Sequence, residues 1–130
     1  MTTLADEKYV VLTTFTKDGR AKPTPVWVVP FDGALAVWTV ADSWKVKRVR
    51  GTGRVRVQGS DVRGRTTHGP VHEGTARVLD ADDSARVAQA TARKYGILGR
   101  LTVGASRLRR GRTGTVGLLL DVRPVDGPAV

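Results

Sequence analysis

Two prolines constrain the fold of this chain more than any other feature. Residues 21–29 have the composition of a β-strand, yet the segment contains Pro23 and Pro25. N–H groups at positions i and i+2 of a strand point toward the same neighbour, so these prolines remove two donors from one side of the strand. That side is therefore not a regular central ladder. It is a sheet edge, the split of a barrel or the wall of a ligand site, and the sequence leaves the three open.

Further strands are expected wherever β-branched and apolar residues cluster between turn signals. Turns are predicted at Lys17-Asp18-Gly19 and around Asp32-Gly33, because glycine and aspartate favour tight reversals. The strand segments, which make six with residues 21–29, are 9–15, 34–40, 54–58, 71–79 and 115–122. Six antiparallel strands of this length, mostly joined by hairpins, predict a mainly β fold built as a small barrel with appended helices.

Two helices are expected between these strands. A short one follows Asp42 and Ser43, either of which can cap it. A longer one spans about residues 83–95, after an aspartate-rich start. In the strand before it, at residues 71–79, Gly74 marks a potential bulge. The apolar stripe predicted for the longer helix comprises Val87, Thr91, Tyr95 and Leu98. Residues 60–70 are predicted to form a loop, and residues 101–114 are left unassigned.

Length and composition narrow the class of protein. The chain has 130 residues, which predicts a single domain over 1–130 with its core at about 4–124. It has no cysteine, which excludes disulfides, zinc–thiolate sites and cysteine nucleophiles. The N-terminus has neither a basic nor an apolar region typical of a signal peptide. No run approaches the roughly 18 apolar residues of a membrane span, and we expect a cytoplasmic protein.

Basic charge is concentrated in one stretch. The net charge is +10, and eight Lys or Arg residues but one acid, Asp61, lie between Lys45 and Arg65. The stretch predicts a site for a phosphorylated or otherwise anionic ligand. Nucleic acid is not expected, because Trp44 is the single aromatic residue next to this stretch and no DNA-binding spacing occurs. His68 and His72 do not predict a metal site, since no cysteine supports them and Glu73 points to the opposite strand face from His72.

Five short motifs in order resemble one family. They are Leu4-Ala5-Asp6-Glu7-Lys8-Tyr9, Thr13-Thr14-Phe15-x-Lys17-Asp18-Gly19, Thr24-Pro25-Val26-Trp27, Ala41-Asp42-Ser43-x-Lys45-Val46-Lys47-Arg48 and Glu73-Gly74-Thr75-Ala76. The chain resembles the pyridoxamine-phosphate-oxidase-like split-barrel proteins over about residues 4–124. Within them it is most similar to the actinobacterial flavin/deazaflavin oxidoreductases that use coenzyme F420.

The resemblance implies a six-stranded antiparallel split β-barrel with one short and one longer helix. It implies a homodimer with a cofactor groove between subunits, and hydride transfer between coenzyme F420 and a small unsaturated substrate. The alternatives are an oxidoreductase of the same fold that uses flavin mononucleotide (FMN), and a non-catalytic protein that binds a cofactor or haem. No residue is assigned a catalytic role, because hydride transfer belongs to the cofactor.

The resemblance also implies which residues hold the cofactor. Ser43, Lys45, Lys47 and Arg48 match the family's phosphate-binding turn and helix, and free N–H groups at a helix N-terminus suit a phosphate. The residues expected along the ring system and beside the phosphate are Pro25, Val26, Trp27, Trp38, Thr39 and Trp44. Trp44 stands where relatives often carry glycine. Arg63, Arg65 and the Arg107–Arg112 cluster either match the acidic tail of coenzyme F420 or are solvated.

Overall fold

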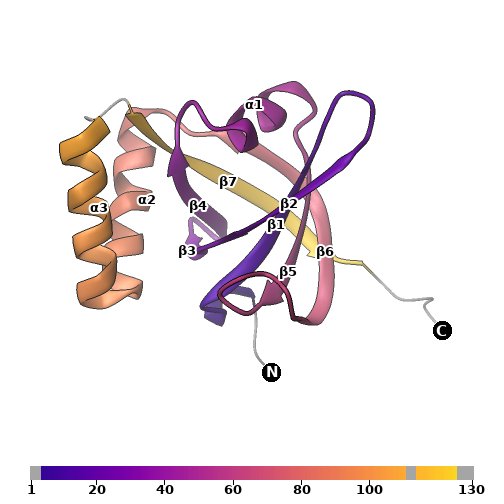
Figure 1. The fold of residues 1–130 in the computed structure, drawn as a ribbon, viewed down its shortest axis with the longest axis horizontal. Coiled ribbons are helices and arrows are strands. Elements are labelled where there is room, and N and C mark those ends of the chain that lie inside the picture. Colours follow the sequence, from indigo (N-terminus) through magenta and orange to yellow (C-terminus); the bar gives the residue numbers. More distant parts are fainter. Residues whose placement is uncertain (1–3, 111–113, 126–130) are drawn as a thin grey trace.

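One curled antiparallel sheet dominates the computed structural model (Figure 1). The structure describes residues 4–110 and 114–125 and, within these, all side chains except those at positions 97, 99 and 106–110. The strands pair in the order β2-β1-β5-β6-β7-β4-β3. Their bounds are β1 (Tyr9–Phe15), β2 (Ala21–Val26), β3 (Val29–Phe31), β4 (Ala34–Val40), β5 (Arg54–Ser60), β6 (Thr67–Val78) and β7 (Thr115–Pro124). This confirms the predicted mainly β fold.

The sheet has seven strands instead of six because the second expected strand is divided. Trp27 and Val28 lie outside the ladder, between β2 and β3. Among the described strands, β2 pairs only with β1 and β3 only with β4, so both are edges. The chain therefore crosses from one edge of the sheet to the other through two residues. Pro23 and Pro25 lie in β2, which confirms the sheet-edge alternative for this segment.

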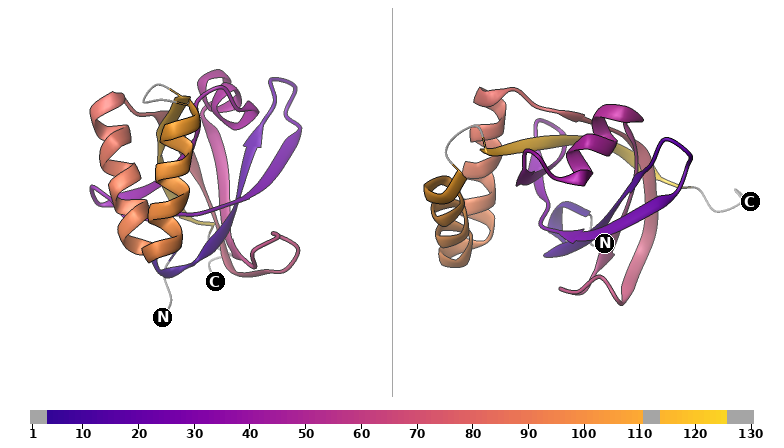
Figure 2. Two further views of the ribbon diagram at one scale, coloured as in Figure 1. Left: turned by 60° about the vertical axis from the view of Figure 1, so that its left-hand side comes forward. Right: turned by 45° about the horizontal axis from the view of Figure 1, so that its top comes forward.

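The helices occupy two places around the sheet. Helix α1 (Trp44–Gly51) follows β4, whereas α2 (Ala81–Lys94) and α3 (Gly96–Arg110) lie side by side against one flank of the barrel (Figure 2). A short 3₁₀ turn, η1 (Leu4–Asp6), precedes β1. In the part of the chain with described coordinates, no helix is long and apolar enough to cross a membrane.

Helix α3 was not predicted, and it includes residues 101–110 of the segment that the sequence left unassigned. Helix α2 ends where Gly96 takes a φ of +63°, a conformation that suits glycine and lets the chain turn back on itself. The predicted buried stripe is therefore interrupted at this point. Val87 and Thr91 are buried, whereas Leu98 is 56% exposed because it belongs to α3.

Two predictions about β6 were wrong. Part of the expected loop 60–70 is ordered as strand, since β6 begins at Thr67. Gly74 does not mark a bulge: it pairs in register with Val55 and Val122, and the irregularity of the β5–β6 pair lies between Val57 and Gly59. Glycine at position 74 instead allows close approach of strand β7. A Cβ atom there would lie 1.9 Å from the carbonyl oxygen of Asp121.

Valine and leucine side chains form the core in two clusters. The larger cluster fills the curl of the sheet and includes fully buried Leu12, Val57 and Leu118. The second lies between the sheet and α2, where Phe31 and Val87 meet with their neighbours from β4. Aliphatic side chains are thus sufficient to fill the curl of the sheet, since the larger cluster contains no aromatic residue among its described members.

We expect Gly74→Ala to destabilise the fold strongly, because the added methyl group overlaps a backbone oxygen that cannot move without shifting β7. The loss in the free energy of unfolding should reach at least about 3 kcal/mol, the upper end of ordinary single-residue effects. Gly104→Ala in α3 is the control, since its Cβ would meet no atom within 4 Å. Urea denaturation measures both, and equal stability of the two variants would contradict the close packing at Gly74.

Candidate functional site

The N-terminus of helix α1 carries the most unusual polar group of the molecule. The chain leaves β4 at Val40 and turns through Asp42 into Ser43, whose N–H donates to the Val40 carbonyl oxygen at 3.1 Å. Of the two predicted candidates, Ser43 is the N-cap, with extended backbone angles, but its side chain forms no capping hydrogen bond. Among the described side chains, the Ser43 hydroxyl oxygen is the buried polar atom that lacks a partner.

A buried hydroxyl without a partner costs about 1–3 kcal/mol, so its retention points to a ligand. The backbone N–H groups in the first turn of a helix also lack intrahelical acceptors, and the helix dipole adds a partial positive charge. Anions bind readily at such a place. The Ser43 hydroxyl and the first turn of α1 therefore fit a phosphate group.

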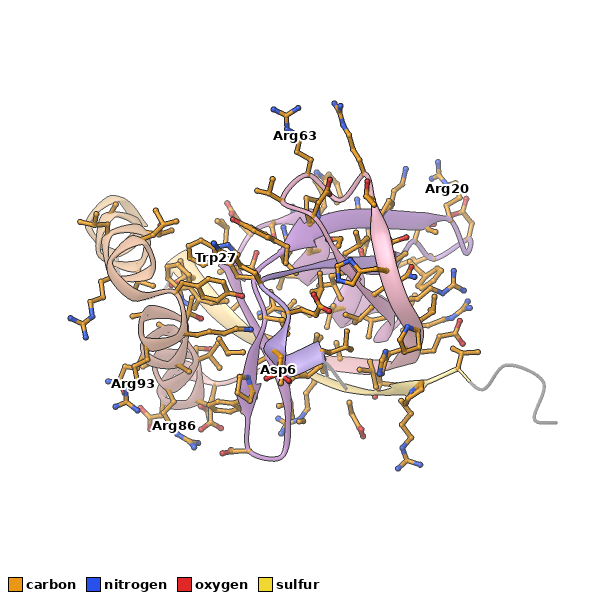
Figure 3. All side chains as sticks on the ribbon, turned by 90° about the horizontal axis from the view of Figure 1, so that it is seen from below. Asp6, Arg20, Trp27, Arg63, Arg86 and Arg93 are labelled. Atoms are coloured by element: carbon orange, nitrogen blue, oxygen red, sulfur yellow. The ribbon has the colours of Figure 1, made fainter. Side chains whose placement is uncertain are left out.

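A hollow beside this turn, which we call the ring hollow, collects most of the predicted ring-binding residues. Its volume is about 290 Å³. It lies at the divided strand, with Trp27 on the side of the barrel that faces the two long helices (Figure 3). The lining residues are Pro25, Val26, Trp27, Trp38, Thr39, Val40, Lys45, Thr102 and Thr115. Two indole rings, a proline and one ammonium group can hold a flat aromatic ligand that carries negative charge.

Lys45 is the cation of the ring hollow. Burial lowers the pKa of its ammonium group, and the positive charge of Arg48 lowers it further. No carboxylate is recorded within salt-bridge distance of it in the described part of the chain. A bound anion would restore the favourable surroundings that Lys45 loses on folding.

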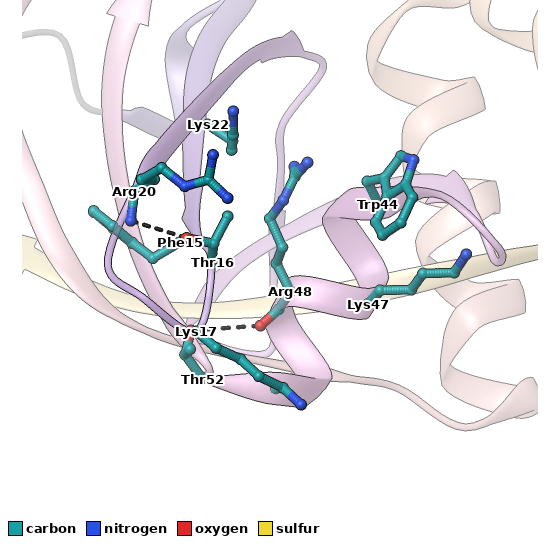
Figure 4. Close-up of a pocket in the computed structure, with 10 residues that line it drawn as sticks. Phe15, Thr16, Lys17, Arg20, Lys22, Trp44, Lys47, Arg48 and Thr52 are labelled. Atoms are coloured by element: carbon teal, nitrogen blue, oxygen red, sulfur yellow. Dashed lines mark hydrogen bonds between the residues drawn. The ribbon is translucent and has the colours of Figure 1, made fainter.

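A second hollow, which we call the basic hollow, lies between α1 and the β1–β2 hairpin (Figure 4). Its volume is about 380 Å³. The residues around it are Phe15, Thr16, Lys17, Arg20, Lys22, Trp44, Lys47, Arg48, Gly51 and Thr52. Five of these are cations, and Asp18 is the neighbouring acid, held 3.2 Å from the Arg20 guanidinium. The basic hollow is therefore suited to a ligand with more than one negative charge.

Side chains of α1 form one wall of the basic hollow. The Arg48 guanidinium donates to the Thr14 hydroxyl at 3.4 Å, which directs it toward β1. The Lys47 ammonium lies 4.5 Å from the centre of the Trp44 ring, a cation–π contact. Trp44 itself is 67% exposed, so an apolar surface stands open at the rim.

The structure thus divides nine of the ten predicted binding residues between two hollows, and Ser43 lines neither of them. The ring hollow takes Lys45 with the residues of β2 and β4, and the basic hollow takes Trp44, Lys47 and Arg48. Sequence reasoning missed the hairpin cations as site residues, although Lys17 lies in the predicted turn and Arg20 and Lys22 follow within three positions of it. It also missed Thr102, because the helix that carries it was not expected.

Trp27 is fixed by Tyr95, the residue that caps the C-terminal end of helix α2. Its ring stacks on the Tyr95 ring with centroids 4.2 Å apart and an 8° angle between planes. Burial raises the pKa of Tyr95 to about 12, which outweighs the opposing effect of its hydrogen bond with Val28. The tyrosine is therefore a neutral aromatic partner under ordinary conditions.

Several other predicted candidates lie elsewhere or outside the description. Arg63 and Arg65 are exposed and line neither hollow. The Arg107–Arg112 cluster falls on side chains and residues that the structure does not describe. His68 pairs with Glu7 at 2.8 Å, and His72 borders a third hollow of about 320 Å³.

Two serine substitutions should have opposite effects on stability. Ser43→Ala removes a hydroxyl without a partner, so the free energy of unfolding should stay equal or rise slightly. Ser84→Ala is the comparison, because the Ser84 hydroxyl accepts from the Gly117 N–H at 2.9 Å. Loss of this hydroxyl leaves a buried donor without a partner. That should cost about 1–3 kcal/mol. A Ser43→Ala variant as unstable as Ser84→Ala would show that Ser43 has a structural partner after all.

Alkaline pH should reveal the burial of Tyr95. Between its ordinary value of 10.0 and about 12, the unfolded chain loses the Tyr95 proton while the folded chain retains it. The folded state then binds more protons, so this contribution to stability is full below pH 10 and is lost as pH rises through the window. Tyr95→Phe should decline less steeply with pH in the same urea titrations. Parallel declines in both proteins would contradict the shift.

Structural comparison connects this architecture with known proteins, although no family model and no curated protein matches the sequence. The conserved hypothetical protein Rv2991 of Mycobacterium tuberculosis superposes with a TM-score of 0.69 at 22% identity, over 92% of this chain and 76% of that one. The haem storage protein HutZ of Vibrio cholerae gives 0.64 at 15% identity, over 94% and 84%.

A Listeria innocua protein, provisionally named a pyridoxamine 5′-phosphate oxidase, gives a TM-score of 0.59 at 15% identity, over 93% of this chain and 90% of that one. At such identities the likeness establishes the fold alone. This chain has the split-barrel fold of the pyridoxamine 5′-phosphate oxidase-like proteins.

Proposed function

We propose that this protein is a split-barrel oxidoreductase that binds coenzyme F420, with FMN as the alternative cofactor. The observation that carries the proposal is the buried, unpartnered hydroxyl of Ser43 at the N-terminus of α1. Ser43, the N–H groups of the first turn and Lys45 hold the phosphate. Trp27 and Trp38 in the ring hollow hold the planar ring system.

The charge of the basic hollow favours coenzyme F420 over FMN. FMN carries one phosphate, whereas coenzyme F420 carries a phosphate and an acidic oligoglutamate tail. Five cations around the basic hollow exceed what a single phosphate needs. Such a cofactor supplies hydride transfer when bound, and the protein contributes binding, orientation and exclusion of water. The substrate proposed is a small unsaturated molecule that binds in the ring hollow beside the cofactor ring.

Haem is the second candidate ligand, favoured by the likeness to HutZ and by the place of His72. Neither histidine of the chain lines the ring hollow or the basic hollow. His72 borders the third hollow together with apolar Leu4, Leu35 and Leu120. Haem bound there would have an imidazole within the same hollow, and a Soret band lost in His72→Ala would identify it.

A homodimer is part of the proposal. Leu98 and Leu101 on α3 are 56% and 66% exposed, and Trp44 is an exposed aromatic residue at the rim of the basic hollow. Apolar side chains of this size are commonly covered by a partner. Light scattering coupled to size-exclusion chromatography measures the mass, and a monomer at all concentrations contradicts this part of the proposal.

Fluorescence titrations with coenzyme F420 and with FMN test the function. Ser43→Ala and Lys45→Ala should each weaken cofactor binding by about 10- to 100-fold, since each loses a hydrogen bond to a charged group. Lys8→Ala is the matched control, an exposed lysine that lines none of the three hollows. The double variant Lys22→Ala/Arg48→Ala should affect coenzyme F420 more than FMN. Failure of wild-type protein to bind either cofactor would overturn the proposal.

A further inference from the structure

Two residues at the C-terminal end of helix α2, Lys94 and Tyr95, bind the backbone of Val28 where the strand is divided. Val28 is fully buried and lies outside the ladder, so its backbone groups cannot pair with a neighbouring strand. Buried backbone groups of this kind need other partners. The Tyr95 hydroxyl accepts from the Val28 N–H at 3.1 Å, and the Lys94 ammonium donates to the Val28 carbonyl oxygen at 2.6 Å. Two consecutive side chains therefore satisfy both polar groups of one residue.

The same two side chains also bind the N-terminal segment. Lys94 donates to the carbonyl oxygens of Ala5 at 2.9 Å and Glu7 at 2.6 Å, which completes its three donors. Tyr95 donates to the carbonyl oxygen of Lys8 at 2.8 Å. Burial lowers the pKa of Lys94, while Asp6 and Glu7 act in the opposite direction. The end of α2 thus joins the N-terminal turn to the crossing between β2 and β3.

Trp27 is the residue next to this anchored position. One face of its indole is covered by the Tyr95 ring at 4.2 Å, and the indole lines the ring hollow with Trp38 and Lys45. Its backbone neighbour Val28 is held by Lys94 and Tyr95. The place and plane of the Trp27 ring are therefore set by α2.

We propose that Tyr95 and Lys94 are positioning residues for the ring hollow, and that they set its affinity for a planar ring by holding Trp27 in place. The inference rests on the proposed function for the identity of the ligand. Neither residue lines the ring hollow, so both act through Trp27 and Val28. A stacked aromatic pair with an anchored backbone presents a rigid surface, which lowers the entropy lost when a ring binds.

The first test needs no ligand. In a Trp38→Phe/Trp44→Phe background, Trp27 is the sole tryptophan, because the chain has three. Its fluorescence should be quenched by acrylamide more strongly in Tyr95→Leu than in the parent. The increase in quenching should be smaller in Tyr95→Phe, which retains the stack. Arg93→Met is the control, an exposed side chain one position before Lys94 that points away from the barrel (Figure 3). Equal quenching in Tyr95→Leu and the parent overturns the inference.

The second test separates ring binding from phosphate binding in the otherwise unaltered protein. Affinity is measured for the cofactor that binds and for the phosphate-free compound with the same ring and ribityl chain, which is riboflavin for FMN or the corresponding deazariboflavin for coenzyme F420. Tyr95→Leu should weaken both by about tenfold, equivalent to about 1.4 kcal/mol, and leave their ratio unchanged. Ser43→Ala should instead lower the affinity for the cofactor more than the affinity for the phosphate-free compound. The positioning role is overturned if Tyr95→Leu changes the ratio of these two affinities, or if its affinity for the phosphate-free compound is undiminished.

Two further outcomes remain distinguishable. If Tyr95→Leu does not fold, Lys94→Met takes its place, because it retains the apolar stem but lacks the ammonium that binds Val28. Lys94→Met should increase the quenching of Trp27 and weaken binding of the phosphate-free compound. If both stay unchanged, the inference is overturned. If wild-type protein binds no cofactor, the proposed function fails, whereas the quenching measurements still decide whether α2 positions Trp27.

Discussion

The division of one strand at Trp27 and Val28 is the constraint on which the other features depend. Pro23 and Pro25 lie in an edge strand, where missing donors are tolerated. Because the ladder stops there, the barrel stays split, and a hollow remains at the split where a closed barrel would have a regular pair of strands. The buried backbone of Val28 then needs partners from elsewhere, and the end of α2 provides them.

The polar groups around α1 are arranged at a cost to the protein without a ligand. Ser43 keeps a buried hydroxyl without a partner, Lys45 keeps a partly desolvated charge, and the hairpin brings several cations together. Each of these is unfavourable alone, and the valine-rich core offsets them. All of them lie around helix α1, and a bound anion relieves the cost of each group that it contacts.

Sequence patterns predicted the strands well because alternating valines report directly on a half-buried sheet, as in β5 with Val55 and Val57. They did not predict α3, whose glycines and arginines give no helical signal until the segment packs against α2. The cofactor-binding role of the candidate residues stays a prediction. The sequence did not show that most of them lie in two separate hollows, because this depends on how the hairpin folds over α1. Lys94 was invisible for a similar reason, since its partners are carbonyl oxygens from distant segments.

The separation of the two hollows has a consequence for the kinetics of ligand capture. The basic hollow is open and rich in charge, so it attracts anions over a distance, and this attraction weakens as salt screens it. The ring hollow acts at contact, through the indole surfaces of Trp27 and Trp38. Ionic strength should therefore govern how fast a ligand arrives, while the stacked Trp27 governs how long it stays.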